Sequence, residues 1–342
     1  MNDMMNIWVL TEGIAGTENQ CLGVAEALQR NLSMPIKITT YRLQLKQPWK
    51  TLLPYIGYVG ERIYDMRATN EIPNAPWPAL VIASGRKAIA TALHIKKQSH
   101  GKTSVVNLQD PRWAAKRFDL VAVPFHDKYR GKNALVTHGA PNRVTVQKLN
   151  AESTKWSPPK AWGVDKATDK EDHKRETVAF LIGGKSKAYD FTGSTTGEII
   201  TMINRLAQEK YNVMVTASRR TGAENYAALR AAFSDAPHVY FWGGEGYNPY
   251  FSYLAHADHI IVTPDSASML SEAASTGKAV YCLALQGGNA KFKRFHRHMV
   301  DIGAVKMLSL GSSILNFSPR MILNDAALVA EKISALIAEK QD

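Results

Sequence analysis

The sequence is poor in cysteine and has fewer acidic than basic residues. Only two cysteines occur, Cys21 and Cys282, and each lies inside an apolar pattern. This pattern favours buried thiols in a reducing cytoplasm over a disulfide, and two cysteines cannot build a metal cluster. The 42 Lys and Arg residues exceed the 30 Asp and Glu residues, for a formal charge of +12. An anionic partner is therefore expected, such as phosphate, nucleic acid or anionic lipid.

Long apolar runs are also missing. The most apolar stretch, Ala79 to Ile95, is interrupted by Arg86 and Lys87, so no run of about 18 apolar residues exists that could span a bilayer. The first residues include Asp3 rather than a basic cluster, and the apolar residues 7–10 are too few for a signal peptide. We expect a cytoplasmic protein. Nucleic-acid-binding motifs are missing too, so we expect no nucleic acid partner.

The remaining composition is that of a globular protein large enough for two domains. The chain has 342 residues, of which 45% are hydrophobic and 21% charged. Short Val- and Ile-rich runs alternate with amphipathic patterns, which predicts an α/β fold with mostly parallel sheets. In the first half the predicted strands are residues 7–10, 36–41, 80–83, 104–108, 120–124 and 134–137, with a helix at 21–32. In the second half they are 178–182, 213–217, 239–242, 260–263 and 279–283, with helices at 197–209, 223–233, 249–256 and 267–275.

A polar, charged stretch separates the two alternating halves. Residues 150–177 contain Pro158, Pro159 and a dense charged run, which indicates a domain linker. The alternative is an ordinary surface loop within one domain. We predict an N-terminal domain at 1–160 and a C-terminal domain at 175–323, with a last helix within 324–342 that crosses back onto the first domain.

The strongest motif runs from Thr263 to Lys278, after a predicted strand and at a helix start. Free N–H groups and the helix dipole there form an anion site, and the Ser266 and Ser268 hydroxyls can donate to a pyrophosphate. Glu272, one turn into the helix, can accept hydrogen bonds from a ribose. The alternative is plain helix capping by Asp265, Ser266 or Ser268.

Two further loops follow predicted strands at the same sheet edge. Gly183, Gly184 and Lys185 form a turn in which paired glycines let the backbone approach a phosphate, although the spacing is not that of a Walker loop. The next strand is followed by the residues Ser218, Arg219 and Arg220. The alternative for the first loop is an ordinary glycine turn, and the alternative for the second is a solvated charged loop. These loops lie at one edge, where open parallel sheets bind ligands, and their agreement predicts a phosphate-binding site.

The first half offers candidates for catalysis and for binding a second substrate. Glu12, in the first strand–helix turn, is a candidate general base, and Asp110 and Asp127 are alternatives. Basic residues in the loops that follow the strands of this half could bind an anionic acceptor: Arg86, Lys87 and Arg112. For each of these residues, the alternative is an ordinary surface position without a catalytic or binding role.

Two other segments have more than one interpretation. The aromatic and aliphatic stretch from Trp49 to Trp77 is predicted to be a buried helix of the first domain, with a membrane-contact face as the alternative. The basic stretch from Lys291 to Arg297 could contact phosphate or lipid, or form a solvated helix face with Phe anchors.

These motifs together resemble the mitochondrial-fission ELM family, whose bacterial members are regarded as GT-B glycosyltransferases. The resemblance covers nearly the whole chain and rests on residues 11–20, 84–87, 109–112, 182–184, 248–250, 254–258 and 263–278. Two positions depart from the pattern: Tyr247 stands where an acidic residue is frequent, and Ala279 where proline is common.

The resemblance implies two Rossmann-like domains facing a cleft, with a nucleotide-sugar donor bound mainly by the second and the acceptor by the first. It adds Asn248, Asp265 and Met269 to the donor site and implies neither metal nor cofactor. The expected function is transfer of a sugar to a cell-envelope glycolipid or polysaccharide such as lipopolysaccharide, on the cytoplasmic side of a membrane and in peripheral contact with it. The alternatives are a nucleotide-sugar epimerase and a non-catalytic membrane-associated scaffold.

Overall fold

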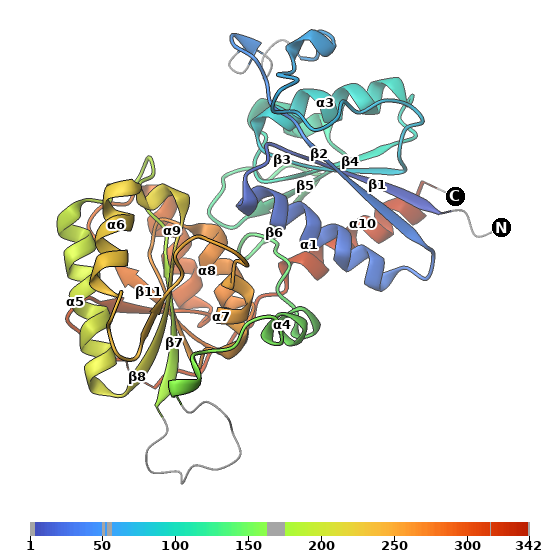
Figure 1. Ribbon diagram of the computed structural model, residues 1–342. Helices are drawn as coiled ribbons and strands as arrows, with labels where there is room; N and C mark the ends of the chain where they lie inside the picture. The colour runs from blue at the N-terminus through green and yellow to red at the C-terminus, as the bar shows by residue number, and fades with distance from the viewer. Residues whose placement is uncertain (1–3, 50–51, 53–56, 163–174, 315, 341–342) are drawn as a thin grey trace. The chain divides into compact units, whose positions relative to one another are not determined.

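The computed structural model describes residues 4–49, 52, 57–162, 175–314 and 316–340 (Figure 1). The chain divides into two compact units. Unit 1 comprises residues 1–143 and 324–342, and unit 2 comprises residues 144–323.

Unit 1 is built on a six-stranded parallel sheet in the order β2-β1-β3-β4-β5-β6. Its strands are β1 (Met5–Thr11), β2 (Ile36–Arg42), β3 (Leu80–Ser84), β4 (Ser104–Leu108), β5 (Leu120–Pro124) and β6 (Ala134–Thr137). Its helices are α1 (Ala15–Asn31), α3 (Arg86–Gln98) and α10 (Asp325–Ala338), with short 3-10 helices η1 (Glu61–Ile63) and η2 (Arg112–Arg117).

Both faces of the unit 1 sheet are buried, which explains its nearly continuous apolar strands. In β1, Trp8 and Leu10 join the core under α3, whereas Ile7 and Val9 join the core under α1 and α10. Figure 1 shows α3 on one face and α1 with α10 on the other. The strand order reverses between β1 and β3, so the loops after these two strands flank the point where doubly wound sheets bind ligands.

Unit 2 repeats this architecture with the strand order β12-β11-β10-β7-β8-β9, again all parallel. Its strands are β7 (Glu176–Ile182), β8 (Tyr211–Ala217), β9 (Val239–Phe241), β10 (His259–Val262), β11 (Ala279–Ala284) and β12 (Lys306–Ser309). Its helices are α4 (Val146–Ser153), α5 (Gly193–Glu209), α6 (Ala223–Ala232), α7 (Tyr250–His256), α8 (Ala267–Ala274) and α9 (Ala290–Asp301), with 3-10 helices η3 (Lys160–Trp162) and η5 (Arg219–Thr221). Here the order reverses between β7 and β10.

The division between the units differs from the predicted boundary near residue 160. It falls after Arg143, because α4 packs against α7 and its Leu149 lies in a core of unit 2. Within the predicted linker, residues 163–174 lie outside the described part. Residues 324–342 belong to unit 1, where α10 packs on α1.

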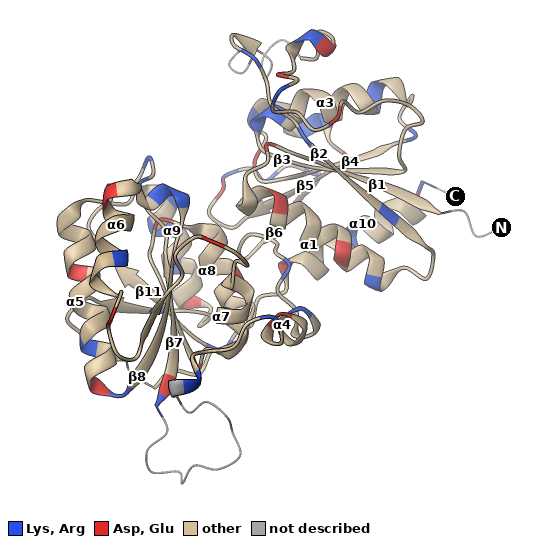
Figure 2. Cartoon of the chain, in the orientation of Figure 1, with Lys and Arg blue, Asp and Glu red and all other residues tan. Residues whose placement is uncertain are grey.

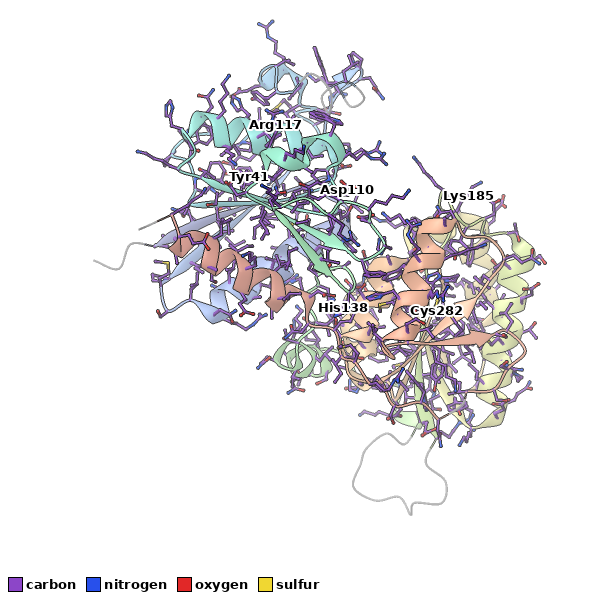
Figure 3. The ribbon with its side chains drawn as sticks, turned by 180° about the vertical axis from the view of Figure 1, so that it is seen from behind. Tyr41, Asp110, Arg117, His138, Lys185 and Cys282 are labelled. Atoms are coloured by element: carbon purple, nitrogen blue, oxygen red, sulfur yellow. The ribbon has the colours of Figure 1, made fainter. Side chains whose placement is uncertain are left out.

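Both cysteines are buried free thiols, as the apolar pattern around each indicated. Cys21 lies on α1 in unit 1. Cys282, labelled in Figure 3, lies on β11 in unit 2. Burial raises the pKa of each thiol, so both are protonated and unreactive at neutral pH.

The segment from Trp49 to Trp77 has a mixed environment. Of the segment 49–77 the structure describes 49, 52 and 57–77, and there Ile63 and Tyr64 are buried while Val59 and Met66 are exposed. The predicted buried helix does not form in residues 57–77, where the structure has only the 3-10 helix η1. In the described residues, no helix combines the length and hydropathy that crossing a bilayer requires.

Candidate functional site

Three loops of unit 2 meet around the buried side chain of Asp265. Asp265 follows β10, is 2% exposed at its side chain, and accepts hydrogen bonds from the Gly184 amide at 2.9 Å and the Thr263 hydroxyl at 2.7 Å. The Arg220 guanidinium forms an ion pair with the Asp265 carboxylate at 2.8 Å. Since β10, β7 and β8 are neighbours in the sheet, this carboxylate joins the loops on both sides of the strand-order reversal.

The paired glycines allow this close approach of the loops. A Cβ atom on Gly183 would lie 2.2 Å from Asp265 Oδ2, and one on Gly184 would lie 2.2 Å from the Arg220 backbone. Their amides are already used, because Gly183 N–H donates to Thr263 Oγ1 at 2.7 Å and Gly184 N–H to Asp265. The glycines therefore pack the site, a role different from the predicted backbone contact with phosphate.

The loop after β8 is held by the carbonyl of Gly183. The Ser218 and Thr221 hydroxyls both donate to it at 2.6 Å. Arg219, on the same short helix η5, is exposed and makes no hydrogen bond or ion pair with the described residues. Lys185 lies after β7 in unit 2 (Figure 3), forming an exposed ion pair with Asp190 at 3.7 Å. This edge thus presents cationic side chains that solvent can reach.

The start of α8 confirms the capping interpretation for Ser266. Ser266 is the N-cap residue, and its hydroxyl accepts a hydrogen bond from Met269 N–H at 3.4 Å. The Met269 side chain packs on the core, and Ser268 is partly buried in the first turn. The positive end of the helix dipole lies directly after Asp265, which still favours an anion nearby.

Glu272 lies deeper than its predicted contact with a ribose suggests. The residue is 4% exposed, and its Oε2 accepts a hydrogen bond from the Tyr250 hydroxyl at 2.5 Å. Burial and the Glu272 charge raise the pKa of Tyr250 well above its ordinary value, so the phenol remains a donor. Asn248 is exposed, and its side-chain oxygen accepts a hydrogen bond from Tyr250 N–H at 3.1 Å at the start of α7. The Tyr250–Glu272 hydrogen bond then links α7 to α8.

One residue of the predicted basic face turns inward instead. His296 of α9 is hydrogen-bonded through Nε2 to the Pro264 carbonyl at 3.0 Å, directly before Asp265. Burial lowers the pKa of His296, which favours a neutral ring that donates this bond. Phe295 is buried, whereas Lys291 and Arg294 remain on the exposed side. Sequence spacing gave no signal that His296 would support the Asp265 turn.

In unit 1, Glu12 after β1 caps the helix that follows β3. Its Oε1 accepts a hydrogen bond from Lys87 N–H at 3.1 Å, and Oε2 lies 3.5 Å from the Lys87 ammonium. The ammonium also donates to Gln44 Oε1 at 2.6 Å, and the Gln44 amide binds the Glu12 carbonyl. Gly85 makes room, since a Cβ there would lie 2.7 Å from Glu12 Oε1. The Lys87 ammonium is thus already bound by Glu12 and Gln44, and the Glu12 carboxylate already has a cationic partner.

Asp110 has fewer side-chain interactions than Glu12, the first candidate for the general base. Its Oδ1 accepts from Arg112 N–H at 2.7 Å, and its own N–H donates to Asp127 Oδ2 at 3.4 Å. The flanking residues Gln109 and Arg112 have φ of 80° and 58°, a conformation that costs energy in residues other than glycine. Strain of this kind clusters at functional sites.

The exposed side chains predicted to bind the acceptor occupy two separate loops of unit 1. Arg86 starts α3 and Arg112 starts η2. Neither makes a side-chain hydrogen bond or ion pair within the described residues. Across those residues, no cluster of three or more His, Cys, Asp or Glu side chains suited to a metal ion is present.

Comparison with known proteins places this geometry in context. The family model for mitochondrial fission ELM1 matches residues 15–337. The chain is 26% identical over 286 residues to mitochondrial fission protein ELM1 of Arabidopsis thaliana, an alignment covering 77% of this chain but only 65% of that protein. It is 25% identical to an uncharacterized protein of Rickettsia prowazekii (strain Madrid E), covering 96% of this chain and 98% of that protein.

Among solved structures, UDP-GlcNAc 2-epimerase from Neisseria meningitidis bound to UDP-GlcNAc is similar with a TM-score of 0.51. The two chains are 15% identical, and the alignment covers 98% of this chain and 92% of the epimerase. At this identity the likeness shows a shared fold. The fold is the α/β GT-B type, with two Rossmann-like units. Because the family model matches most of its length, the chain belongs to the mitochondrial fission ELM1 family.

Proposed function

We propose that this protein binds a nucleotide-sugar donor at the Asp265 edge of unit 2 and transfers the sugar to a hydroxyl of a glycolipid or polysaccharide. The observation that supports this proposal is that the loops after β7, β8 and β10 meet at Asp265, where the strand order reverses. Ligands bind at that place in open α/β sheets.

A diphosphate leaving group needs positive charge, and this edge supplies it. Arg219 and Lys185 are exposed, and Arg220 keeps 41% of its side chain exposed while one end is anchored on Asp265. An anchored guanidinium is already oriented, so less conformational entropy is lost when it binds an anion. The amino end of α8 adds a favourable dipole. The predicted contacts of Asn248, Ser268 and Glu272 belong to the same proposal.

For the acceptor, we assign Asp110 as the general base that removes the hydroxyl proton, with Arg86 and Arg112 binding an anionic acceptor. The Oδ2 atom of Asp110 makes no hydrogen bond with described residues, whereas Glu12 caps α3 and pairs with Lys87. In an inverting reaction, the acceptor oxygen would attack the sugar carbon as Asp110 takes its proton and the nucleoside diphosphate leaves.

Binding of a panel of nucleotide sugars, measured by calorimetry, tests the donor site. Arg219→Ala removes an exposed cation without breaking a contact in the described structure, and should weaken binding by about tenfold. Arg230→Ala, an exposed arginine of α6, is the matched control and should change nothing. Equal affinity of the Arg219→Ala variant and the wild type for every donor would reject the site.

The catalytic assignment has its own test. Asp110→Asn should keep donor affinity but lower the transfer rate by at least about 100-fold, because a general base contributes roughly that much. Glu12→Gln serves as the comparison, and a larger loss there would move the base to Glu12. Nuclear magnetic resonance of the donor without acceptor separates the rivals: an epimerised donor indicates an epimerase, and donor binding without turnover a scaffold.

A further inference from the structure

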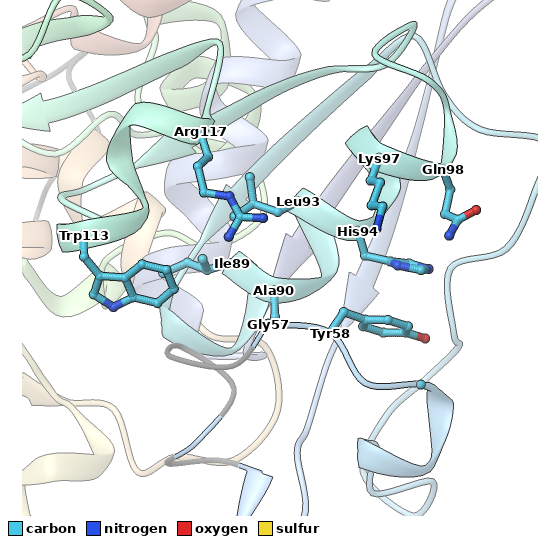
Figure 4. Close-up of a pocket in the computed structure, with 11 residues that line it drawn as sticks. Gly57, Tyr58, Ile89, Ala90, Leu93, His94, Lys97, Gln98, Trp113 and Arg117 are labelled. Atoms are coloured by element: carbon cyan, nitrogen blue, oxygen red, sulfur yellow. The ribbon is translucent and has the colours of Figure 1, made fainter.

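A cavity in unit 1 is lined by none of the residues assigned above. It has a volume of about 540 Å³ and lies between α3, η2 and the segment 57–60 (Figure 4). Pockets for small molecules have volumes of about 300–1,000 Å³. The cavity is therefore large enough for an organic ligand of its own.

One part of the lining is apolar. Ile89, Ala90 and Leu93 come from consecutive turns of α3 and keep a small exposed fraction. Trp113, on η2, points toward α3 in Figure 4, and the Tyr58 ring stacks on His94 with centroids 3.8 Å apart. Aliphatic groups between aromatic rings suit a hydrocarbon chain.

The rest of the lining is cationic. Lys97 lies near the end of α3, on the same face as Ala90 and Leu93. Arg117 extends from η2 toward Leu93 in Figure 4. Neither side chain has an ion-pair partner among the described residues, and the cavity lining contains no Asp or Glu. Burial, together with the Lys97 charge, lowers the pKa of His94, so this ring adds no charge at neutral pH. Figure 2 marks the basic residues of α3, which has no acidic residue at all.

We propose that this cavity binds one molecule of a long-chain alkyl or isoprenyl phosphate, with the chain against Ile89, Ala90 and Leu93 and the phosphate between Lys97 and Arg117. An inorganic anion would leave the apolar side chains of Ile89, Ala90 and Leu93 uncovered. An uncharged chain would leave two cations without a counter-charge. The site does not depend on sugar transfer, because it shares no residue with the proposed donor and base sites.

Decyl phosphate, kept below its micelle concentration, is the probe for the full-length protein in titration calorimetry. We expect one molecule to bind per chain and the affinity to fall with added salt. The double variant Lys97→Ala with Arg117→Ala should bind at least about tenfold more weakly, since both charge-assisted contacts are lost. Trp113→Ala tests the apolar wall and should also weaken binding.

The matched control carries the same loss of charge outside the cavity. Lys102→Ala with Lys116→Ala removes two exposed cations that do not line it, and should bind like the wild type. All variants should share the thermal midpoint of the ligand-free wild type, which shows that they fold. Equal weakening in the control would overturn the site.

Three comparison ligands separate the possible sources of the affinity. Sodium phosphate or uncharged decyl maltoside binding as tightly as decyl phosphate would each contradict the amphipathic ligand. Vesicles containing anionic lipid test the surface alternative. Vesicle binding without measurable binding of decyl phosphate would overturn a single-molecule site.

Discussion

Glu152 is a buried carboxylate held by three donors in unit 2. The Lys148 and Lys155 ammonium groups each lie 2.9 Å from its Oε1, and the Tyr247 hydroxyl donates to its Oε2. Burial alone would raise the pKa of Glu152, but these bonds outweigh it and lower the pKa to about 2. Tyr247, which departs from the family pattern, thus ties the loop before α7 to α4.

We expect Glu152→Gln to lower the free energy of unfolding at pH 7 by about 1–3 kcal/mol. A carboxylate whose pKa is depressed in the folded state stabilises fully above its ordinary value of 4.5. This stabilisation is lost as the pH falls through the folded value. The difference between wild type and variant in urea unfolding should therefore shrink from pH 4.5 toward pH 2. Glu331→Gln, at an exposed position in the middle of α10, should show no such pH-dependent difference.

For individual residues of the candidate site, the sequence predicts where they lie in the fold but not which residues they contact. Parallel strands bring their following loops to one edge, so Gly183, Arg220 and Asp265 could be placed together without a structure. Their partners could not, because the Asp265–Arg220 ion pair depends on contacts between residues far apart in sequence. Gln44 had no sequence signal, although it binds both Glu12 and Lys87.

At the scale of elements, α5 shows how a cap sets where a helix begins. The predicted start was Gly197, but the helix begins at Gly193 after Thr192, whose hydroxyl accepts from Thr195 N–H at 3.2 Å. The apolar pattern alone could not show the first turn, because that turn is mostly polar. In a similar way, the apolar run from Ala79 to Ile95 contains β3 and most of α3, which are separated by Gly85 with a φ of 92°.

Thr192→Ala should cost about 1 kcal/mol of unfolding free energy, because one N–H group at the helix start loses its acceptor. Denaturant unfolding measures the effect. Thr201→Ala is the matched control on the exposed face of the same helix, where the hydroxyl only bonds the carbonyl of Gly197. It should change stability by less than about 0.5 kcal/mol. Equal losses in the two variants would contradict the cap.

At the scale of the whole molecule, the last helix, α10, completes a hydrophobic core of unit 1. Val329 and Ile333 are fully buried against α1 and the sheet. The Asp325 carboxylate accepts from His138 N–H at 2.9 Å and from Gly139 N–H at 2.8 Å, which fixes α10 to the end of β6.

Ile333→Ala should therefore destabilise unit 1 by about 2–4 kcal/mol while leaving unit 2 unchanged. Hydrogen exchange with mass spectrometry should show faster exchange in α1 and β6 but not in β7 to β11. Leu328→Ala changes a 39% exposed residue of the same helix and should have little effect. Faster exchange in both units with Ile333→Ala would mean that they unfold as one.

The insertion of unit 2 between the two parts of unit 1 has a consequence for how the chain folds as a ribosome makes it. Domains usually fold in the order of synthesis, the amino-terminal one first. Here α10 is made after unit 2, so one face of the unit 1 sheet is covered by α1 alone until unit 2 has been synthesised. The second unit to be translated is the first able to finish folding, and the surface of α1 that α10 later covers stays exposed during that interval.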